Sequence, residues 1–428
     1  FSLPRVNLTG LNLPAPLSGH VKGMMVYNLT ISPDNHLNEG VYYNNGEKWH
    51  PVISDENMNT VIIFLRQPGF IWLGDDGNLT DTLSFELAAV DKTGFTYQWY
   101  RRDPETLLST PVTGATSDKI IINPAGSPNK ANYGITEKGK VYQFYCVVVN
   151  GSQYGISGTG RVVFGPGARL ANGGWINVAN ANLGADQNKS LAEQLAYTPT
   201  AAASGVNDKD CDPAVYGDWY QWGRKKDGHE NRTVLAANTS LNYLNAVNGV
   251  KVDSLDTSSG QIKSNLSNIS GKFIQRNDGT GDWRQYPANA PTNTDIAPAD
   301  AWTWNNANND PCKDLGAKWR VPTQAEWAQI HTSNTWVWRD GAGSTTSGYE
   351  IKPGGAGKPS SLFLPATGAR SRGNGAPYSV GASGHYWSSI VTGTGSYSLN
   401  FTSGSIAPAS TSARSTGLPV RCVSESSD

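Results

Sequence analysis

Charged side chains are scarce in this 428-residue chain. They make up only 16% of its residues, against about 25% in an average globular protein. The 34 Lys and Arg against 35 Asp and Glu leave a formal net charge of −1. Binding to a nucleic-acid backbone needs clustered Lys and Arg, so the composition excludes nucleic acid as the expected partner. Disorder is also disfavoured, because disordered chains combine a high net charge with few aromatic residues.

Long apolar runs and known catalytic patterns are missing as well. One of the longest apolar runs covers only residues 61–65, whereas a membrane-spanning helix needs about 18 residues. No His-x-x-x-His, Gly-x-Ser-x-Gly or P-loop pattern occurs, and the histidines are scattered. His229, beside Glu230, lies in a charged turn without a second histidine nearby. We therefore expect neither a transmembrane segment nor an enzyme.

Cysteine is rare, with four residues at positions 146, 211, 312 and 422. None forms a Cys-x-x-Cys pair, which disfavours zinc and thioredoxin-like sites. Four cysteines allow three complete pairings. Their wide spacing fits either the long-range disulfides of a secreted protein or buried free thiols.

Glycine, asparagine, serine, threonine and aromatic residues dominate instead, with 47 Gly and 14 Trp. This composition is typical of β-rich extracellular domains with long loops, and the length predicts two to four domains. We predict a short β-rich module at 1–59, a β-sandwich at 60–166 and a third domain at 167–428, with a boundary at 165–167. In the first module, Asn45-Gly46 between two aromatic runs predicts a β-hairpin.

Residues 60–166 have the pattern of an all-β domain with about seven short strands. Trp99 and Cys146 lie in two segments in which polar and apolar residues alternate. Their positions resemble the core positions of immunoglobulin-like domains of bacterial surface proteins. The resemblance implies that Trp99 packs beside Cys146. Residues 85–89 lack the usual partner cysteine, and Phe144 lacks the hydroxyl of a tyrosine corner. We therefore interpret Cys146 as a buried free thiol and the domain as a spacer.

One helix can be located within residues 167–428. Thr323 and Glu326 form a capping box, in which each side chain bonds the other residue's backbone N–H group. Pro322 and Trp327 are placed for a hydrophobic staple. The sequence therefore predicts a helix that begins at Thr323 and runs past Ile330.

Seven sequence blocks in residues 167–428 resemble, in order, the Fibrobacter-type major paralogous domain, a bacterial relative of the C-type-lectin-like fold. The blocks are 182–186, 220–225, 309–312, 319–327, 364–368, 386–389 and 420–423. The Arg-x-Pro-Thr-x-x-Glu-Trp block with a terminal Arg-Cys also resembles the formylglycine-generating-enzyme fold. The resemblance implies an α+β, C-type-lectin-like domain with long loops after the all-β immunoglobulin-like sandwich. It also implies a disulfide between Cys312 and Cys422. No cysteine matches the active groove of the formylglycine-generating relatives, so that activity is not expected.

Aromatic and arginine side chains in the long loops are the candidate ligand contacts of this domain. Aromatic faces stack on the apolar faces of sugars, and arginine donates to hydroxyl groups. The predicted ligand-binding residues are Trp302, Trp304, Arg370, Arg372 and Tyr378. The alternative is that these residues pack within the fold. We predict such a structural role, in packing or helix capping, for five other residues: Trp99, Thr323, Glu326, Trp327 and Trp387.

No cofactor is expected, although Asp-rich turns offer oxygen ligands of the kind that calcium binds. The candidate turns are 74–78, 277–282 and 305–310. None matches the EF-hand loop, and ordinary turn formation is the alternative explanation.

Together these features favour a non-enzymatic adhesin or binding protein of the bacterial cell surface, of the Bacteroidetes type. Its lectin-like domain would recognise glycan or protein on a host or on another bacterium. The alternative is a structural pilus-tip or surface-assembly subunit that docks to neighbouring subunits. In both cases we expect a secreted or cell-surface location, with a precursor anchored in the outer membrane.

Overall fold

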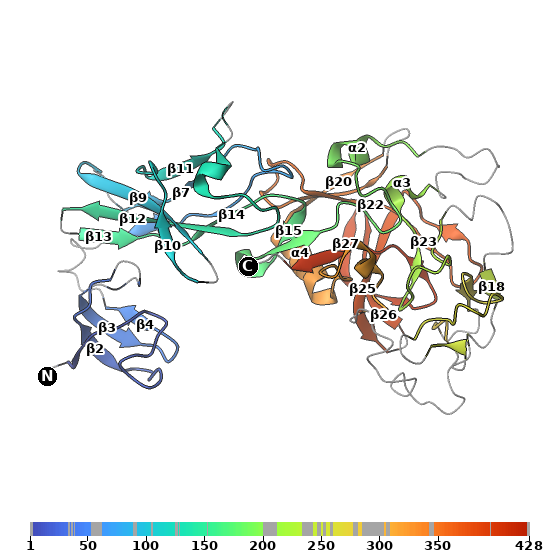
Figure 1. Cartoon of the computed structure of the whole chain (residues 1–428), viewed down its shortest axis with the longest axis horizontal. Coiled ribbons are helices and arrows are strands. Elements are labelled where there is room, and N and C mark those ends of the chain that lie inside the picture. The colour runs from blue at the N-terminus through green and yellow to red at the C-terminus, as the bar shows by residue number, and fades with distance from the viewer. Residues whose placement is uncertain are drawn as a thin grey trace. The chain divides into compact units, whose positions relative to one another are not determined.

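A computed structural model gives the fold, which is built mostly of β-strands with few helices (Figure 1). The residues that it describes are 3–32, 35, 37, 39–52, 62–88, 92–103, 106–124, 127, 129–151, 153–199, 212–232, 243–245, 250, 254–256, 260–276, 281–284, 304, 309–341, 346–393 and 395–425. The chain divides into two compact units, residues 1–164 and 165–427. Within the described ranges, every helix is too short or too polar to cross a membrane.

The N-terminal module of the first unit is a four-stranded sheet with the order β1-β2-β3-β4. Its strands are β1 (Arg5–Val6), β2 (Met25–Asn28), β3 (Gly40–Asn44) and β4 (Trp49–Pro51). One face packs on a small core of Leu8, Val26, Leu37, Tyr42 and Trp49. This separate core gives the module an inner and an outer face.

The predicted hairpin at Asn45-Gly46 is confirmed, because β3 and β4 pair antiparallel from Asn44 opposite Trp49. Its loop has four residues, 45–48, rather than the two of the tightest hairpins. The Asn45 side chain closes this loop by accepting the N–H groups of Glu47 and Lys48, both at 2.9 Å.

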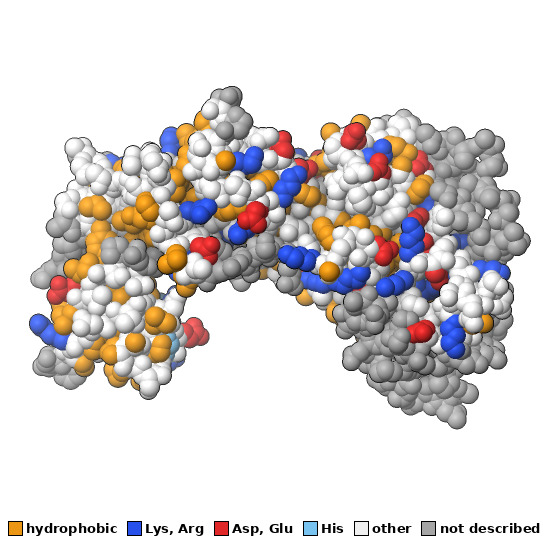
Figure 2. All heavy atoms as spheres, in the orientation of Figure 1, with side chains coloured by type: hydrophobic (Ala, Val, Ile, Leu, Met, Phe, Trp, Pro, Cys, Tyr) orange, Lys and Arg blue, Asp and Glu red, His pale blue; other side chains and the backbone are white. Residues whose placement is uncertain are grey.

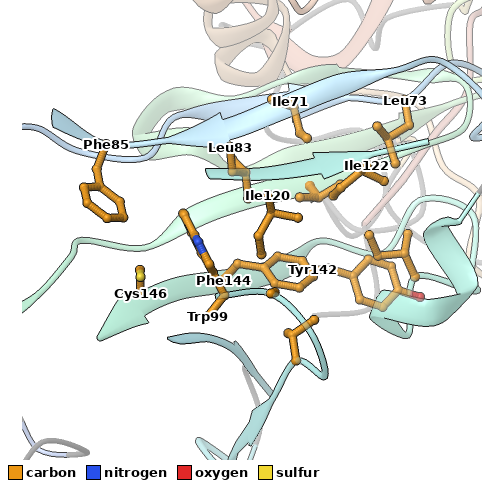
Figure 3. Close-up of a cluster of buried hydrophobic side chains, with 14 of the residues drawn as sticks. Ile71, Leu73, Leu83, Phe85, Trp99, Ile120, Ile122, Tyr142, Phe144 and Cys146 are labelled. Carbon is orange, nitrogen blue, oxygen red and sulfur yellow. The ribbon is translucent and has the colours of Figure 1, made fainter. Parts of the chain in front are cut away.

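The rest of the first unit is a two-layered β-sandwich. One layer has the order β10-β9-β12-β14-β6, with β13 also paired to β12, and strands β7 and β11 form a second sheet. Its elements are β5 (Phe64–Arg66), β6 (Phe70–Trp72), β7 (Asp81–Ser84), β8 (Glu86–Leu87), β9 (Phe95–Arg102), β10 (Ser109–Pro111), β11 (Lys119–Ile122), η2 (Lys130–Tyr133), β12 (Tyr142–Asn150), β13 (Gln153–Ile156) and β14 (Gly160–Val163). Alternate residues of both layers point inward and form one apolar core (Figure 3).

Trp99 and Cys146 lie directly opposite each other in this core, on β9 and β12. Cys146 is free and fully buried, as interpreted from the sequence. The Phe85 ring approaches Trp99, with 5.7 Å between the ring centroids. The hydroxyl that Phe144 lacks is supplied two residues earlier, by Tyr142. It accepts the N–H groups of Thr136 and Glu137 at 3.0 and 2.7 Å.

The second unit contains several small sheets, with the orders β15-β16-β29, β17-β28-β23-β24, β18-β19, β20-β21-β22 and β25-β26-β27. Its strands are β15 (Gly167–Arg169), β16 (Trp175–Val178), β17 (Tyr220–Gln221), β18 (Tyr243–Asn245), β19 (Phe273–Gln275), β20 (Thr335–Arg339), β21 (Gly348–Lys352), β22 (Leu362–Pro365), β23 (Ala369–Arg370), β24 (Pro377–Tyr378), β25 (Ser383–Thr392), β26 (Gly395–Thr402), β27 (Ser405–Ala413), β28 (Gly417–Leu418) and β29 (Val423–Glu425). Its helical segments are η3 (Ala171–Gly173), α2 (Leu191–Ala196), α3 (Pro213–Tyr216), η9 (Pro311–Leu315) and α4 (Gln324–Ser333).

The helix predicted from Thr323 is confirmed as α4, with Thr323 at its N-cap and both hydrogen bonds of the capping box present. Glu326 also accepts two hydrogen bonds from the Arg320 guanidinium. Trp327 and Ile330 are buried on the face that packs against the β25–β27 sheet. The capped first turn therefore fixes where this apolar face begins.

A disulfide joins Cys312 in η9 to Cys422, next to β29, with 5.6 Å between their Cα atoms. This is the pairing that the lectin-like resemblance implies. Cys211 lies outside the described residues.

Candidate ligand-binding surface

Tyr378 combines an exposed ring with a tightly held backbone. Its side chain is 43% exposed, and its strand β24 pairs with β23. Gly368 packs so closely against the Tyr378 carbonyl that a Cβ atom there would collide with it. The next residue, Ser379, has a φ of 56°, and its carbonyl accepts the N–H groups of Ala382 and Ser383. The ring is thus presented by a backbone with little freedom.

Tyr378 contacts His385 of β25, which lies among polar side chains of β25 and β26. The rings of Tyr378 and His385 lie 6.1 Å apart, and His385 Nε2 is 2.8 Å from Ser383 Oγ. Asn400 lies opposite His385, and Thr402 lies opposite Ser383. Residues two apart in a strand share one face, so these five side chains form a single surface. We call it the Tyr378 surface: Tyr378, Ser383, His385, Asn400 and Thr402.

The Tyr378 surface is uncharged at neutral pH. Burial lowers the pKa of His385, which favours the neutral imidazole, and burial raises the pKa of Tyr378, which keeps its phenol protonated. The surface therefore offers one aromatic face edged by the polar side chains of Asn400 and Thr402, while the His385 ring is already hydrogen-bonded to buried Ser383 and to Asn400. This chemistry suits a neutral ligand that carries many hydroxyl groups.

The two predicted ligand arginines have different positions. Arg370 is buried, with its guanidinium 4.1 Å from the centre of the Phe273 ring. It donates to the carbonyls of Gly375 and His229 at 2.9 and 3.1 Å. Arg370 is thus part of the interior, which corrects its prediction as a ligand contact. Arg372 is half-buried, and its carbonyl accepts the N–H group of Arg276.

Trp304 is also an interior residue, whereas the sequence predicted an exposed ring that stacks on a ligand. It is only 1% exposed. Its ring approaches those of Trp222 and Trp387, at centroid distances of 5.6 and 6.4 Å. Trp387 is fully buried and donates from Nε1 to the Tyr220 carbonyl at 2.7 Å. Trp302 lies outside the described residues.

Asp227, His229 and Glu230 have the composition of a metal site, and their ligand atoms lie within 4.8 Å of one another. However, His229 Nε2 accepts the Gln221 N–H group at 3.1 Å. The proton of this buried ring is therefore on Nδ1, which is 2.5 Å from an Asp227 oxygen. Although burial raises the pKa of Asp227, the Arg224 guanidinium and His229 lower it well below its usual range. Hydrogen bonds thus already use both ring nitrogens.

Among the described residues of the calcium candidates, three carboxylates already accept hydrogen bonds, whereas the buried Asp75 Oδ1 has no hydrogen-bond partner. The Asp76 carboxylate accepts the Asn78 N–H group and the Asn78 side-chain amide, as in an Asx turn. The two Asp310 oxygens accept the N–H groups of Cys312 and Val321. The Asp282 carboxylate is bonded by Arg284 and Arg414. Residues 277–280 and 305–308 lie outside the described residues.

A family model matches the start of the chain. The model is described as a phage tail like trimerisation region, and it matches residues 1–62. These residues include the whole four-stranded N-terminal sheet. The comparison gives no support to a lectin-like or formylglycine-generating-enzyme-like domain in the second unit. No curated protein matches the chain.

Sequence reasoning selected Tyr378 as a candidate but did not select Ser383, His385 or Asn400. They come from two strands that follow Tyr378 in the chain, and their approach depends on the pairing of β25 with β26. The signal in the sequence is the alternation of polar and large apolar residues over 396–402, which predicts the strand that carries Asn400.

Proposed function

We propose that this chain is a non-enzymatic, self-associating binding protein of the bacterial cell surface. Its N-terminal module joins copies of the chain, and its second unit binds neutral glycan through the Tyr378 surface. The lectin-like character of the second unit belongs to this proposal.

The Tyr378 surface carries the binding part of the proposal. A ring that is 43% exposed on a restrained backbone costs little conformational entropy when it stacks on a ligand. The neighbouring amide and hydroxyl groups give hydrogen bonds that fix the orientation of a sugar. The absence of charge among these five side chains favours a neutral glycan over an acidic one.

Self-association rests on the match of residues 1–62 to a trimerisation region. Three linked copies would raise the strength of binding to a surface with repeated ligands, because the second and third contacts become intramolecular. A weak single-site affinity, typical of one exposed aromatic ring, would then suffice.

The test is binding of the full chain to an array of neutral and acidic glycans, with Tyr378→Ala as the variant. We expect the variant to lose at least tenfold in affinity for the neutral glycans that the wild type binds. Tyr378→Phe should retain most of the affinity, because the ring face remains. Ile390→Ala is the matched control, since Ile390 is 41% exposed on β25 and lies outside the Tyr378 surface. Equal binding by wild type and Tyr378→Ala would refute the assignment.

The second candidate is a structural subunit of a surface assembly, and the trimerisation-region match is the observation that favours it. A structural subunit would self-associate but bind none of the glycans on the array. Self-association together with Tyr378-dependent binding would decide for the first candidate.

A further inference from the structure

We infer that the outer face of the N-terminal sheet is the surface through which copies of this chain associate. The inference rests on the self-association proposed above and names the residues that perform it. The inner face of the same sheet is already covered, because Val26 and Tyr42 lie in the module's own core at 2% exposure.

The outer face carries a stripe of apolar side chains from one short segment. Along β2, Met25 is 42% exposed and Tyr27 is half-buried. Val26 and Asn28, which alternate with them, are buried. The alternation continues beyond the strand, with Leu29 at 41% and Ile31 at 61% exposure. The Leu29 N–H group donates to the Val6 carbonyl, so the pairing with β1 also continues. Four alternate residues therefore expose apolar groups on one side.

Neighbouring strands widen this stripe. Tyr43 on β3 pairs with Met25, is 40% exposed and stacks on His50 of β4. The Val52 side chain is 38% exposed, and its N–H group bonds the Val41 carbonyl next to Tyr27. We call Met25, Tyr27, Leu29, Ile31, Tyr43 and Val52 the outer stripe. Figure 2 shows hydrophobic side chains spread over the visible face of this module.

A second copy of the chain is the occupant that these observations favour. A soluble protein rarely leaves several large apolar side chains contiguous on one sheet face unless a partner covers them. The six side chains carry no formal charge, and the charged groups that contact them lie at Tyr27: Arg5 is 5.4 Å over its ring, and Glu39 accepts from its hydroxyl at 3.3 Å. The whole stripe falls within residues 1–62, the part that matches a trimerisation region. Identical copies satisfy these conditions, because three copies related by a threefold axis can each cover part of a neighbour's apolar face in a closed ring.

The test is sedimentation velocity of the full chain over a range of concentrations. The wild type should sediment as three chains. The variant Leu29→Lys/Ile31→Lys should raise the dissociation constant at least tenfold, because each lysine places a charge in the apolar contact. Leu108→Lys is the matched control, since Leu108 is 71% exposed and lies in the sandwich; it should change the dissociation constant less than twofold.

The outcomes separate this inference from the function on which it rests. A wild type that stays a single chain at every concentration would refute the proposed self-association. A wild type that self-associates together with a double variant of equal affinity would overturn only the outer stripe. If the lysine variant loses its β-sheet circular dichroism, Leu29→Thr/Ile31→Thr replaces it, because threonine favours strands. The same tenfold effect is expected, and its absence would overturn the inference.

Discussion

Asp282 holds two buried arginines in the second unit. Its Oδ2 atom accepts from Arg284 Nη2 at 2.6 Å and from Arg414 Nη1 at 3.0 Å. Its Oδ1 atom accepts the backbone N–H and Nε of Arg284, both at 3.0 Å. Although burial raises the pKa of Asp282, the arginines lower it to about 2. The carboxylate is thus charged throughout the physiological range.

Asp282→Asn should reduce the free energy of unfolding by about 3–5 kcal/mol, because two buried arginines lose their counter-charge. Urea denaturation of the variant and the wild type measures the change. Glu86→Gln is the control, because the Arg66–Glu86 pair is more than half exposed and is worth less than about 1 kcal/mol. The contribution of Asp282 should be present above pH 4 and lost as the pH falls through about 2, since its folded pKa is below the ordinary value of 3.8. A variant as stable as the wild type would contradict this prediction.

Cys146 should be inert in the folded protein. It is fully buried, and burial raises the pKa of its thiol to about 12. Only the thiolate reacts with alkylating reagents. Iodoacetamide at pH 8 should therefore leave Cys146 unmodified in the native protein and modify it fully in denaturant, as measured by mass spectrometry of the peptide. Equal labelling under both conditions would show that the core around Trp99 opens readily.

At the scale of elements, the start of α4 depends on local hydrogen bonds that the sequence itself specifies. Thr323 Oγ1 accepts the Glu326 N–H group at 3.2 Å, and Glu326 Oε2 accepts the Thr323 N–H group at 2.7 Å. The helix then places Trp327 against the β25–β27 sheet, where its Nε1 donates to the Trp387 carbonyl at 3.2 Å. A local cap thus sets the position of a long-range contact.

Thr323→Ala should lower the free energy of unfolding by about 1 kcal/mol, the usual cost of removing an N-cap side chain. Thermal or urea denaturation measures this loss. Thr332→Ala in the same helix should be close to neutral, because Thr332 is exposed and its hydroxyl bonds only carbonyls of its own helix. If both substitutions cost the same, capping is not the reason for the effect.

At the scale of the whole molecule, the Cys312–Cys422 disulfide closes a loop with a sequence separation of 110. Chain entropy assigns such a bridge about 4–5 kcal/mol as an upper value. The Cys312→Ala/Cys422→Ala variant should therefore lose up to this amount in the unfolding of the second unit. Urea denaturation followed by tryptophan fluorescence measures it, with Cys146→Ala in the first unit as the control. A second unit of unchanged stability would show that its apolar clusters alone hold the closing segments.

Local structure was predictable wherever neighbouring residues determine it. The hairpin at Asn45-Gly46 and the helix capped by Thr323 are two examples, because both depend on bonds that span only a few residues. The position of Trp99 opposite Cys146 also follows from alternating patterns in two strands. Similar local reasoning explains Asp76 as a turn residue.

The exposure of the candidate ligand residues was harder to predict, because exposure is a property of the folded chain. Trp304 and Arg370 have the sequence context of loop residues, yet other aromatic rings cover both of them. Tyr378 lies in the same region and stays exposed. Residue type and spacing do not encode this difference, since it depends on which distant segments pack above each side chain.

The sequence by itself therefore determined the low charge, the β-rich architecture, the capped helix and the paired core positions of the sandwich, all through composition or short-range bonds. Only the tertiary structure decided that Tyr378 contacts His385, which lies opposite Asn400, and that Met25, Leu29 and Ile31 stay exposed within the described part of their module. The physical reason is that strand pairing brings together side chains far apart in the chain, and burial depends on all the segments around a residue at once.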